Sequence, residues 1–307
     1  MYTWEILEEI LDYIEEHLEE DIKTTSLADM ADLSPFYFQR IFKRIVRKPV
    51  QEYIKLRRLA MVTSQLKNTN HRILDIALNY GFSDHANFTR AFKEVYNITP
   101  DEYRKNLPLL NTFNKPEISA NYINIDENVP LIIGDIVLEI QRKTLKNPEV
   151  YLGFEAEVKI EEQIPVGEIT GIDVPGQLWC EFHSKKDLLR DTISDDITLG
   201  MSHSANLEKG IFLYFVGGMA ISTNKNSVNG MVKQTLPAGE YVVCRIEAES
   251  FEELVNTALN QANKYLFEVW LKNHKLATQP FSAEKYYNEE AGTYYMEIWV
   301  MLVDTDI

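Results

Sequence analysis

Cysteine is scarce in this sequence, and long apolar runs are absent. The 307 residues include two cysteines, Cys180 and Cys244, which make no metal-ligand spacing. We expect buried thiols in a reducing cytosol; a redox-sensing pair is the alternative, although neither cysteine lies in a basic setting. No apolar run approaches the roughly 20 residues that cross a bilayer. The acidic, amphipathic start is not a secretory signal, so we expect a cytoplasmic protein without a membrane partner.

Basic charge is also scarce over the whole chain, but it is concentrated in one region. The net charge is −16. Residues 22–106 carry 15 Lys and Arg against 8 Asp and Glu, whereas residues 1–21 carry nine acids and no Lys or Arg. Residues 107–307 carry 16 basic and 30 acidic residues. This distribution predicts a DNA-binding region joined to an acidic partner domain, and the length allows about two domains.

Two copies of one pattern lie in the first hundred residues, at 27–43 and 76–93. In each copy a short apolar helix ends at a turn. A second helix follows, with aromatic residues on its inner face and polar and basic residues on its outer face. This arrangement predicts two helix-turn-helix motifs, with Ser34 and Ser83 as N-caps of the second helices. Two such motifs would read two neighbouring segments of the DNA major groove.

Apolar residues at helical spacing predict the other helices of this region. The first helix packs its inner face through Ile6, Leu7, Ile10, Leu11, Ile14 and Leu18. The first recognition helix is expected from residue 35 to about 46, with Pro35 in its first turn. A linker helix is expected from residue 49 to about 66, and the second recognition helix follows the turn at Gly81.

The region 4–106 resembles the AraC/XylS family of transcription regulators. The matching residues include Leu33-Ser34-Pro35, Phe38, Arg40, Phe42-Lys43 and Pro49 in the first half, and Ile76-Ala77, Gly81-Phe82-Ser83-Asp84, Phe88, Arg90-Ala91-Phe92-Lys93, Thr99-Pro100 and Tyr103-Arg104 in the second. The resemblance implies binding of double-stranded DNA, contact with RNA polymerase, and no cofactor or metal.

The resemblance assigns base contacts to three residues of each recognition helix. They are Phe36, Gln39 and Arg40 in the first helix, and His85, Asn87 and Arg90 in the second. Gln and Arg can make bidentate hydrogen bonds to adenine and guanine. We interpret Lys43 and Lys93 as phosphate contacts. The alternative for the arginines is that they are solvated or form salt bridges within the domain.

The sequence departs from the family just past each recognition helix. The family usually has Gly there, in a left-handed conformation, whereas this chain has Arg47 and Asn97. Asn tolerates that conformation better than Arg. We therefore expect the exit of the first recognition helix to differ in shape.

Beyond residue 106 the chain changes character. Prolines and several Asn predict a linker over residues 107–133. Alternation then predicts strands at 135–142, 149–158, 176–183, 211–221, 239–248 and 293–303, and helices at 184–192 and 250–272. A weak repeat relates residues 151–182 to 215–244, each followed by a helix, and two such units would leave a cleft at their junction.

The last strand carries the candidate effector site. Alternation places Tyr295, Glu297 and Trp299 on one face, where a carboxylate between two aromatic rings would suit an organic cation. An edge strand with an ordinary exposed Glu is the equally weighted alternative. With these residues we group Trp179 and Tyr286.

Residues 134–303 resemble the GyrI-like effector-binding domain, through Leu236-Pro237-Ala238-Gly239-Glu240-Tyr241, Glu284-Lys285-Tyr286 and Tyr295-Met296-Glu297-Ile298-Trp299. The resemblance implies a multidomain protein: an all-α double helix-turn-helix head (1–106), a linker (107–133) and an α+β effector domain (134–307) of two βαββ-type repeats around a cleft. It also implies multidrug sensing, with Glu297 as the functional carboxylate.

The favoured function is a non-enzymatic transcription regulator that senses an amphipathic small molecule, with a lipophilic cation as one option. A hydrolase is the first alternative, because a cleft with Glu and Tyr could support acid–base chemistry. A module that sequesters its ligand without affecting DNA binding is the second. The sequence leaves open the effector, the operator, activation versus repression and the oligomeric state.

Overall fold

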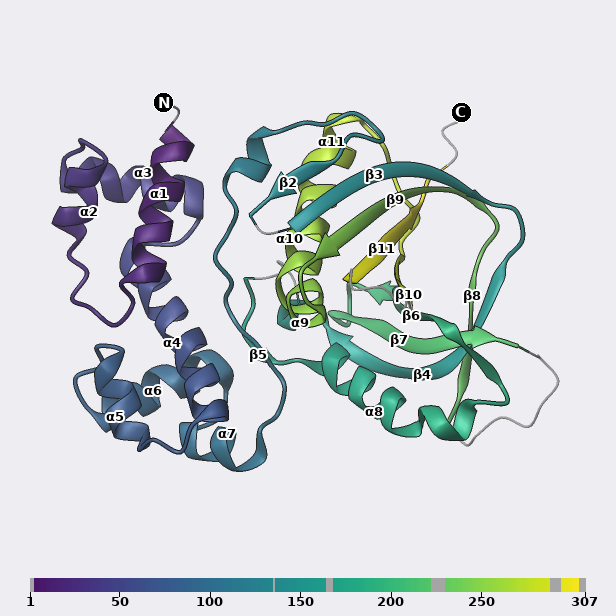
Figure 1. The fold of residues 1–307 in the computed structure, drawn as a ribbon, viewed down its shortest axis with the longest axis horizontal. Helices are drawn as coiled ribbons and strands as arrows, with labels where there is room; N and C mark the ends of the chain where they lie inside the picture. Colours follow the sequence, from purple (N-terminus) through teal and green to yellow (C-terminus); the bar gives the residue numbers. More distant parts are fainter. Residues whose placement is uncertain (1–2, 135, 164–167, 222–229, 288–293, 304–307) are drawn as a thin grey trace. The chain divides into compact units, whose positions relative to one another are not determined.

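The computed structural model describes residues 3–134, 136–163, 168–221, 230–287 and 294–303. The chain divides into two compact units (Figure 1). Unit 1 comprises Met1–Tyr122 and Gly167–Ile172, and unit 2 comprises Ile123–Val166 and Asp173–Ile307. A short segment from the middle of the sequence therefore belongs to the N-terminal unit.

Unit 1 is helical. Its helices are α1 (Thr3–Glu16), α2 (Thr24–Met30), α3 (Pro35–Val46), α4 (Val50–Asn68), α5 (Ile73–Asn79), α6 (His85–Tyr96) and α7 (Pro100–Asn106), followed by η1 (Ser119–Tyr122). The pairs α2–α3 and α5–α6 lie where the two helix-turn-helix motifs were expected, and α4 connects them.

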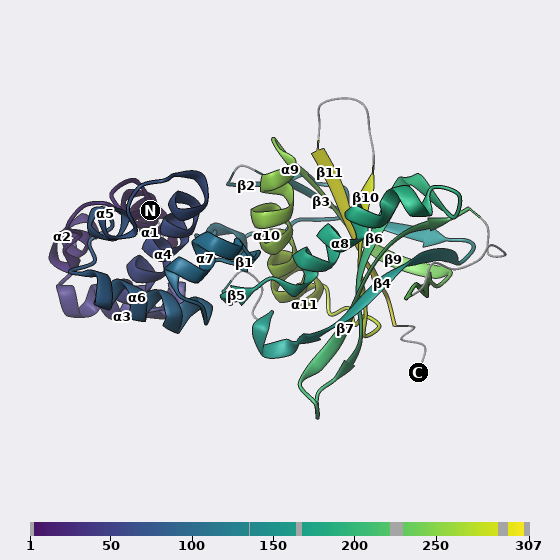
Figure 2. The ribbon, with the colours of Figure 1, turned by 90° about the horizontal axis from the view of Figure 1, so that it is seen from below.

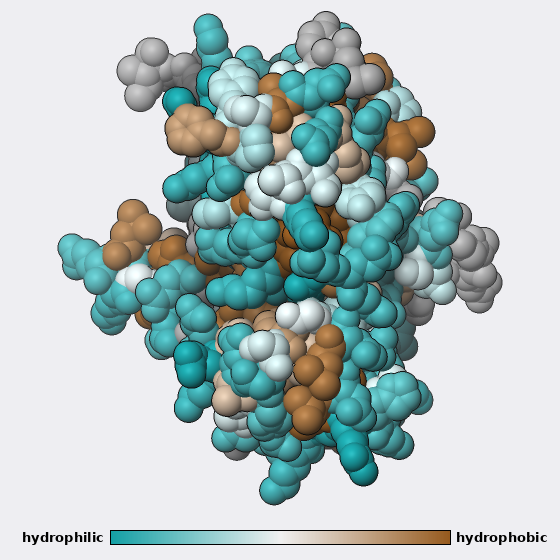
Figure 3. All heavy atoms as spheres, turned by 90° about the vertical axis from the view of Figure 1, so that its left-hand side faces the viewer, coloured by the Kyte–Doolittle hydropathy of each residue, from teal (hydrophilic) through white to brown (hydrophobic). Residues whose placement is uncertain are grey.

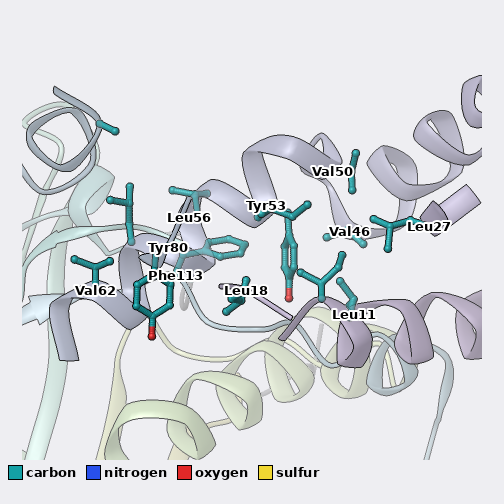
Figure 4. Packing of buried hydrophobic residues seen from close by; sticks show 14 of the residues in the cluster. Leu11, Leu18, Leu27, Val46, Val50, Tyr53, Leu56, Val62, Tyr80 and Phe113 are labelled. Atoms are coloured by element: carbon teal, nitrogen blue, oxygen red, sulfur yellow. The ribbon is translucent and has the colours of Figure 1, made fainter. Parts of the chain in front are cut away.

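The long helix α4 supplies the centre of the helical core. Figure 4 shows Val50, Tyr53 and Leu56 on the side of α4 that faces α1 and the residues after it. The Tyr53 ring meets the rings of Phe42 and Phe113 edge-on, each at 5.8 Å between centroids. A buried stripe along one helix therefore joins α1, the first recognition helix and residues beyond α7.

Two arginines of α4 are part of this core and do not point to DNA. Arg57 forms a salt bridge with Glu15 at 2.7 Å and donates to the Phe113 carbonyl at 2.5 Å. Arg58 donates to the Leu18 carbonyl at 2.9 Å. These bonds satisfy one backbone carbonyl after α1 and one after α7, and part of the basic charge of this region is thus structural.

The N-termini of the recognition helices confirm one predicted cap and correct the other. Ser34 caps α3 by accepting from the Tyr37 amide at 3.3 Å. For α6 the N-cap is Asp84, not Ser83: its carboxylate accepts from the Asn87 amide at 2.8 Å, because Asp84 is the extended residue directly before the helix.

The expected difference at the exit of α3 is also wrong. Arg47 and Asn97 both adopt the left-handed conformation, with φ of 64° and 61°. The two C-cap residues therefore share one backbone conformation, and Arg47 takes on the conformational cost that a Gly would avoid.

The segment after α7 packs onto the helical unit. Phe113 and Ile118 are buried in its core, and Lys115 forms a salt bridge with Asp12 at 2.5 Å. Strand β1 (Leu110–Asn111) pairs with β5 (Gly171–Ile172) in a separate two-stranded sheet. The first part of the predicted linker, up to Tyr122, thus lies in unit 1.

Unit 2 is built on one curved antiparallel sheet. Its strands are β2 (Leu131–Ile133), β3 (Ile136–Leu145), β4 (Glu149–Lys159), β6 (Ile193–Asn206), β7 (Ile211–Ala220), β8 (Val232–Leu236), β9 (Gly239–Ala248), β10 (Ser282–Tyr287) and β11 (Tyr294–Met301). Their order in the sheet is β2-β3-β9-β11-β10-β6-β7-β4-β8. In the chain, β4 is followed by a helix and then β6 and β7, and β9 by a helix and then β10 and β11.

Helices cover one face of this sheet (Figures 1 and 2). They are α8 (Val174–Leu189) and a continuous helical segment made of α9 (Phe251–Glu253), η3 (Leu254–Ala258), α10 (Leu259–Lys264), η4 (Tyr265–Trp270) and α11 (Leu271–Asn273). A short η2 (Ile160–Glu162) follows β4. On the opposite face, the core includes Tyr151, Tyr241 and Trp299. Each face of the sheet therefore carries its own cluster of buried side chains.

Residues 176–183 are helical, so the predicted strand there is wrong. Asp173 caps α8 by accepting from the Gly176 amide at 2.9 Å, and Pro175 stands in the first turn. Leu178 and Phe182 are buried one helical turn apart, a pattern that also fits alternation over so short a stretch. Because residues 236–244 are extended, the expected repeat between 151–182 and 215–244 is wrong as well.

Truncating Phe113 should destabilise unit 1. We expect Phe113→Ala in the full chain to lower the free energy of unfolding by about 3–5 kcal/mol, because a buried aromatic side chain leaves a cavity against Tyr53. Leu109→Ala, at a position that is 38% exposed, is the matched control. The measurement is urea unfolding followed by helical circular dichroism. Equal stability of the two variants would show that the segment after α7 does not belong to the helical core.

Candidate DNA-binding surface and effector-binding site

The two recognition helices are built alike. α3 and α6 are 12 residues each and begin at residues 35 and 85. Each buries two Phe residues on its inner face: Phe38 and Phe42 in α3, Phe88 and Phe92 in α6. The inward phenylalanines fix which residues of each helix point outward.

All eight side chains that the sequence assigned to DNA lie on exposed positions. They are Phe36, Gln39, Arg40 and Lys43 on α3, and His85, Asn87, Arg90 and Lys93 on α6. Within the described parts of the chain, none of the four basic residues forms a salt bridge. The alternative of intradomain salt bridges for Arg40 and Arg90 therefore has no support in the geometry.

Local contacts hold several of these residues. The Arg40 guanidinium lies 5.8 Å from the centroid of the Phe36 ring, which is 71% exposed. The Asn87 side chain donates to the Ser83 hydroxyl at 3.0 Å, so Ser83 orients a recognition residue instead of capping the helix. The molecular surface on the side of unit 1 is mainly hydrophilic, with small separate hydrophobic areas (Figure 3).

In unit 2, Glu297 is buried and already fully bonded. Its carboxylate accepts from Lys143 at 2.5 Å, from the Tyr287 hydroxyl at 2.7 Å and from the Trp299 indole at 2.9 Å. Burial raises the pKa of Glu297, but the Lys143 and Tyr287 hydrogen bonds outweigh it and hold the pKa below its ordinary value. Glu297 is therefore an ionised carboxylate with its own cation.

The face of Trp299 is occupied by the chain as well. The Lys285 ammonium lies 3.7 Å from the ring centroid, and the Lys143 ammonium lies 5.6 Å from it. Lys285 is 2% exposed and forms a salt bridge with Glu149 at 2.7 Å. Two lysines and two glutamates thus balance each other around this ring, and the cation–π position is filled from within.

A second carboxylate lies on the helix-covered face of the same two strands. Glu284 pairs with Ile298 across β10 and β11, whereas the next residue, Lys285, pairs with Glu297. The Glu284 carboxylate accepts from the hydroxyls of Tyr214, at 2.9 Å, and Tyr286, at 3.1 Å. Sequence reasoning did not single out Glu284 because β10 was not predicted as a strand, and it missed Tyr214 although the strand that contains it, β7, was predicted.

Aromatic rings surround Glu284. The Trp179 indole of α8 donates to the Tyr214 hydroxyl at 3.1 Å, and its ring meets the Tyr286 ring edge-on at 4.9 Å. Gly200 makes the space: a Cβ there would stand 2.5 Å from the Tyr214 hydroxyl and 3.2 Å from the Trp179 ring. Glu284, Trp179 and Tyr286 keep partial solvent exposure, while Tyr214 is buried.

The two carboxylates differ in charge balance. Burial raises the pKa of Glu284, and the neighbouring Asp173 carboxylate raises it further. Among the described residues no Lys or Arg pairs with Glu284, whose partners are neutral hydroxyls. Within the part of the chain that the structure describes, Glu284 is thus a carboxylate without a counter-ion, whereas Glu297 has one.

The structure therefore divides the predicted effector residues between two faces. Glu297, Trp299 and Tyr295 lie on the face opposite the helices, where Tyr295 stacks on Tyr287 at 5.1 Å. Trp179 and Tyr286 lie with Glu284 on the helix-covered face. Alternation in a strand forbids neighbours such as Lys285 and Tyr286 from sharing a face.

Within the described ranges, no group of three or more His, Cys, Asp or Glu side chains could hold a metal ion. No described helix is long and apolar enough to span a membrane. Cys244 is buried and Cys180 is exposed, which differs from the expectation that both are buried.

Comparison with known proteins matches both units. Residues 27–106 match a helix-turn-helix domain model, and residues 148–303, more than half of the chain, match the GyrI-like small molecule binding domain. The chain belongs to the AraC-type regulators with a GyrI-like domain. The GyrI-like domain thus contains both carboxylates described above.

The curated relatives match the helix-turn-helix region of this regulator. YbfP of Bacillus subtilis, named as an uncharacterized HTH-type transcriptional regulator, is 41% identical over 34% of the chain and 35% of its own length. PqrA of Proteus vulgaris, named as a probable transcription factor, is 40% identical over 33% of the chain and 84% of its own length. The chain spans about a third of YbfP. A structure of SAV2435 bound to tetraphenylphosphonium matches 54% of the chain and 94% of its own, with 16% identity and a TM-score of 0.39.

Neutralising the two carboxylates should have opposite effects on stability. Because the pKa of Glu297 is lower in the folded protein than in the unfolded chain, where it is near 4.5, its ionisation stabilises the fold at pH values above 4.5. This stabilisation is lost as the pH falls through the pKa of the folded state. Because the pKa of Glu284 is higher in the folded protein than in the unfolded chain, its ionisation destabilises the fold as the pH rises above 4.5. At pH 7 we expect Glu297→Gln to cost about 1–3 kcal/mol, because it leaves Lys143 unpaired. Glu284→Gln should be as stable as the wild type or more stable.

Urea unfolding of both variants and the wild type at pH 7 and pH 4 measures these effects. The difference between Glu284→Gln and the wild type should disappear at pH 4. Destabilisation by Glu284→Gln at pH 7 would mean that Glu284 has a counter-ion in solution.

Proposed function

We propose that this protein is a ligand-responsive transcription regulator. Its helical unit reads two adjacent segments of the DNA major groove with α3 and α6. Its sheet unit binds an amphipathic organic cation, and the ligand changes DNA affinity or contact with RNA polymerase. The observation that carries the proposal is the union, in one chain, of a helix-turn-helix region with a GyrI-like small molecule binding domain.

The DNA-reading role rests on geometry shared by α3 and α6. Both helices bury two Phe residues and leave Arg40 and Arg90 exposed, fifty positions apart and without a salt bridge among the described residues. An unpaired, exposed guanidinium on the outer face of a recognition helix can reach the O6 and N7 atoms of guanine. The lysines one turn further on, Lys43 and Lys93, are placed to contact phosphates.

Arg40→Ala and Arg90→Ala should each weaken binding to the selected DNA site by about 1–3 kcal/mol, while binding to random DNA changes little. Lys67→Ala, an exposed basic residue at the end of α4, is the charge-matched control. The measurement is fluorescence anisotropy with a DNA site recovered from a random pool by the wild-type protein. An equal loss of affinity on random DNA, or an equal loss for Lys67→Ala, would mean that the arginines contact phosphates or act only through the general electrostatic field, and do not read bases.

The effector-binding role rests on the difference between the two carboxylates. A lipophilic cation requires an unpaired negative charge and aromatic faces. Glu284 offers the charge without a counter-ion among the described residues, and Trp179 and Tyr286 offer the rings. We assign the effector to this cluster, which we call the Glu284 site. Glu297, Trp299 and Tyr295 form the second candidate, where a ligand would have to displace Lys143 and Lys285.

Titration with tetraphenylphosphonium and with neutral triphenylphosphine oxide separates the two sites. We expect the wild type to bind the cation in preference, and Glu284→Gln to lose about tenfold or more in affinity for it, as for a charged partner. Glu297→Gln is the matched control and should keep its affinity. Isothermal titration calorimetry measures both. Loss in Glu297→Gln alone would place the ligand on the opposite face, and no binding by any form would overturn the cation assignment.

A further inference from the structure

The C-terminal end of the second recognition helix is held by a residue from the middle of the sequence. Thr170 belongs to unit 1, and its hydroxyl donates to the Val95 carbonyl at 2.9 Å. Val95 lies in the last turn of α6, where backbone carbonyls have no partner within the helix. The Asn97 amide bonds the Lys93 carbonyl at 2.9 Å, so Thr170 adds a bond at the same helix end.

Backbone pairing fixes Thr170 in this position. The next two residues, Gly171 and Ile172, form β5 and pair with Asn111 and Leu110 of β1. Gly171 has φ of 141°, a conformation that favours glycine. Strand β5 also contacts α6. The segment 170–172 is therefore attached to the DNA-binding unit by one side-chain bond and one short ladder.

The same segment leads directly into the helix that carries the Glu284 site. Asp173 is the N-cap of α8, and Trp179 lies in the second turn of that helix. Two residues separate Thr170 from Asp173, and an extended chain covers about 10 Å over these three steps. Such a short connection has little slack, so a displacement of the start of α8 must be taken up at Thr170 or at β5.

We propose that Thr170, with β5, is a positioning residue for the second recognition helix, and that it makes the DNA segment read by α6 the one that responds to the effector. This inference rests on the proposed function. The first recognition helix has no such attachment among the described residues. α3 ends at Val46 and leads through Arg47 into α4, whose arginines bond Glu15 of α1 and the Leu18 carbonyl that follows α1. The two reading helices thus differ in what holds their ends.

The test compares Thr170→Val, which removes the hydroxyl at nearly constant shape, with Thr170→Ser, which restores it. Thr235→Val, at an exposed strand position in unit 2, is the matched control. Full-length proteins are titrated against the selected DNA site and against single-base variants across it, with and without tetraphenylphosphonium. We expect Thr170→Val to lose about two- to tenfold in affinity, the size of one hydrogen bond. The loss of base discrimination should be confined to the half read by α6, which is the half altered by Arg90→Ala.

Thr170→Ser should recover the wild-type profile, and the effect of tetraphenylphosphonium on DNA affinity should shrink in Thr170→Val while its direct binding is unchanged. If Thr170→Val keeps the DNA affinity and base discrimination of the wild type, the inference about Thr170 is wrong, and the proposed function is unaffected. A loss spread equally over both halves, or one matched by Thr235→Val, would overturn the inference in the same way. If the wild type selects no DNA site, the proposed function fails and the inference fails with it.

Discussion

The alternation of side chains along β10 and β11 is the constraint on which the chemistry of the sheet unit depends. It sends Lys285 and Glu297 to one face and Glu284 and Tyr286 to the other. On one face, two lysines and two glutamates neutralise each other around Trp299. On the other, the carboxylate meets hydroxyls and no cation among the described residues. One strand register therefore creates an ion-pair network on one face of the sheet and a carboxylate with only hydroxyl partners on the other.

In the helical unit the corresponding constraint is the buried face of α4. Tyr53 and Arg57 of this helix fix α1, through Glu15, and the segment that contains Phe113. With both motifs attached to one rigid helix, the recognition helices have their outward faces free for DNA. Part of the basic charge in this region forms bonds within that scaffold, whereas Arg40 and Arg90 form no salt bridge with any described residue.

Strong local signals predicted the helical unit well. Ser34, Pro35 and the Phe38–Phe42 spacing defined α3 to the residue, because caps and periodicity act within a few residues of each other. The effector face was harder. Residues 176–183 read as a strand because Leu178 and Phe182 fit either period, and β10 was missed, so Glu284 was not recognised. Asp84 displaced Ser83 as a cap, a choice between adjacent residues that depends on backbone conformation.

The sequence by itself determined the two helix-turn-helix motifs, the basic region that contains them, the GyrI-like resemblance and the identity of the aromatic and acidic residues available for a ligand. Tertiary structure decided which of those residues meet. Strand order placed β7 one strand away from β10, and β3 one strand away from β11. This order joined Tyr214 to Glu284 and Lys143 to Glu297 across long sequence separations. It also attached Thr170 to α6. Such contacts depend on the order of the strands in the sheet and on which distant segments pack together, and local secondary-structure propensity does not determine either of these.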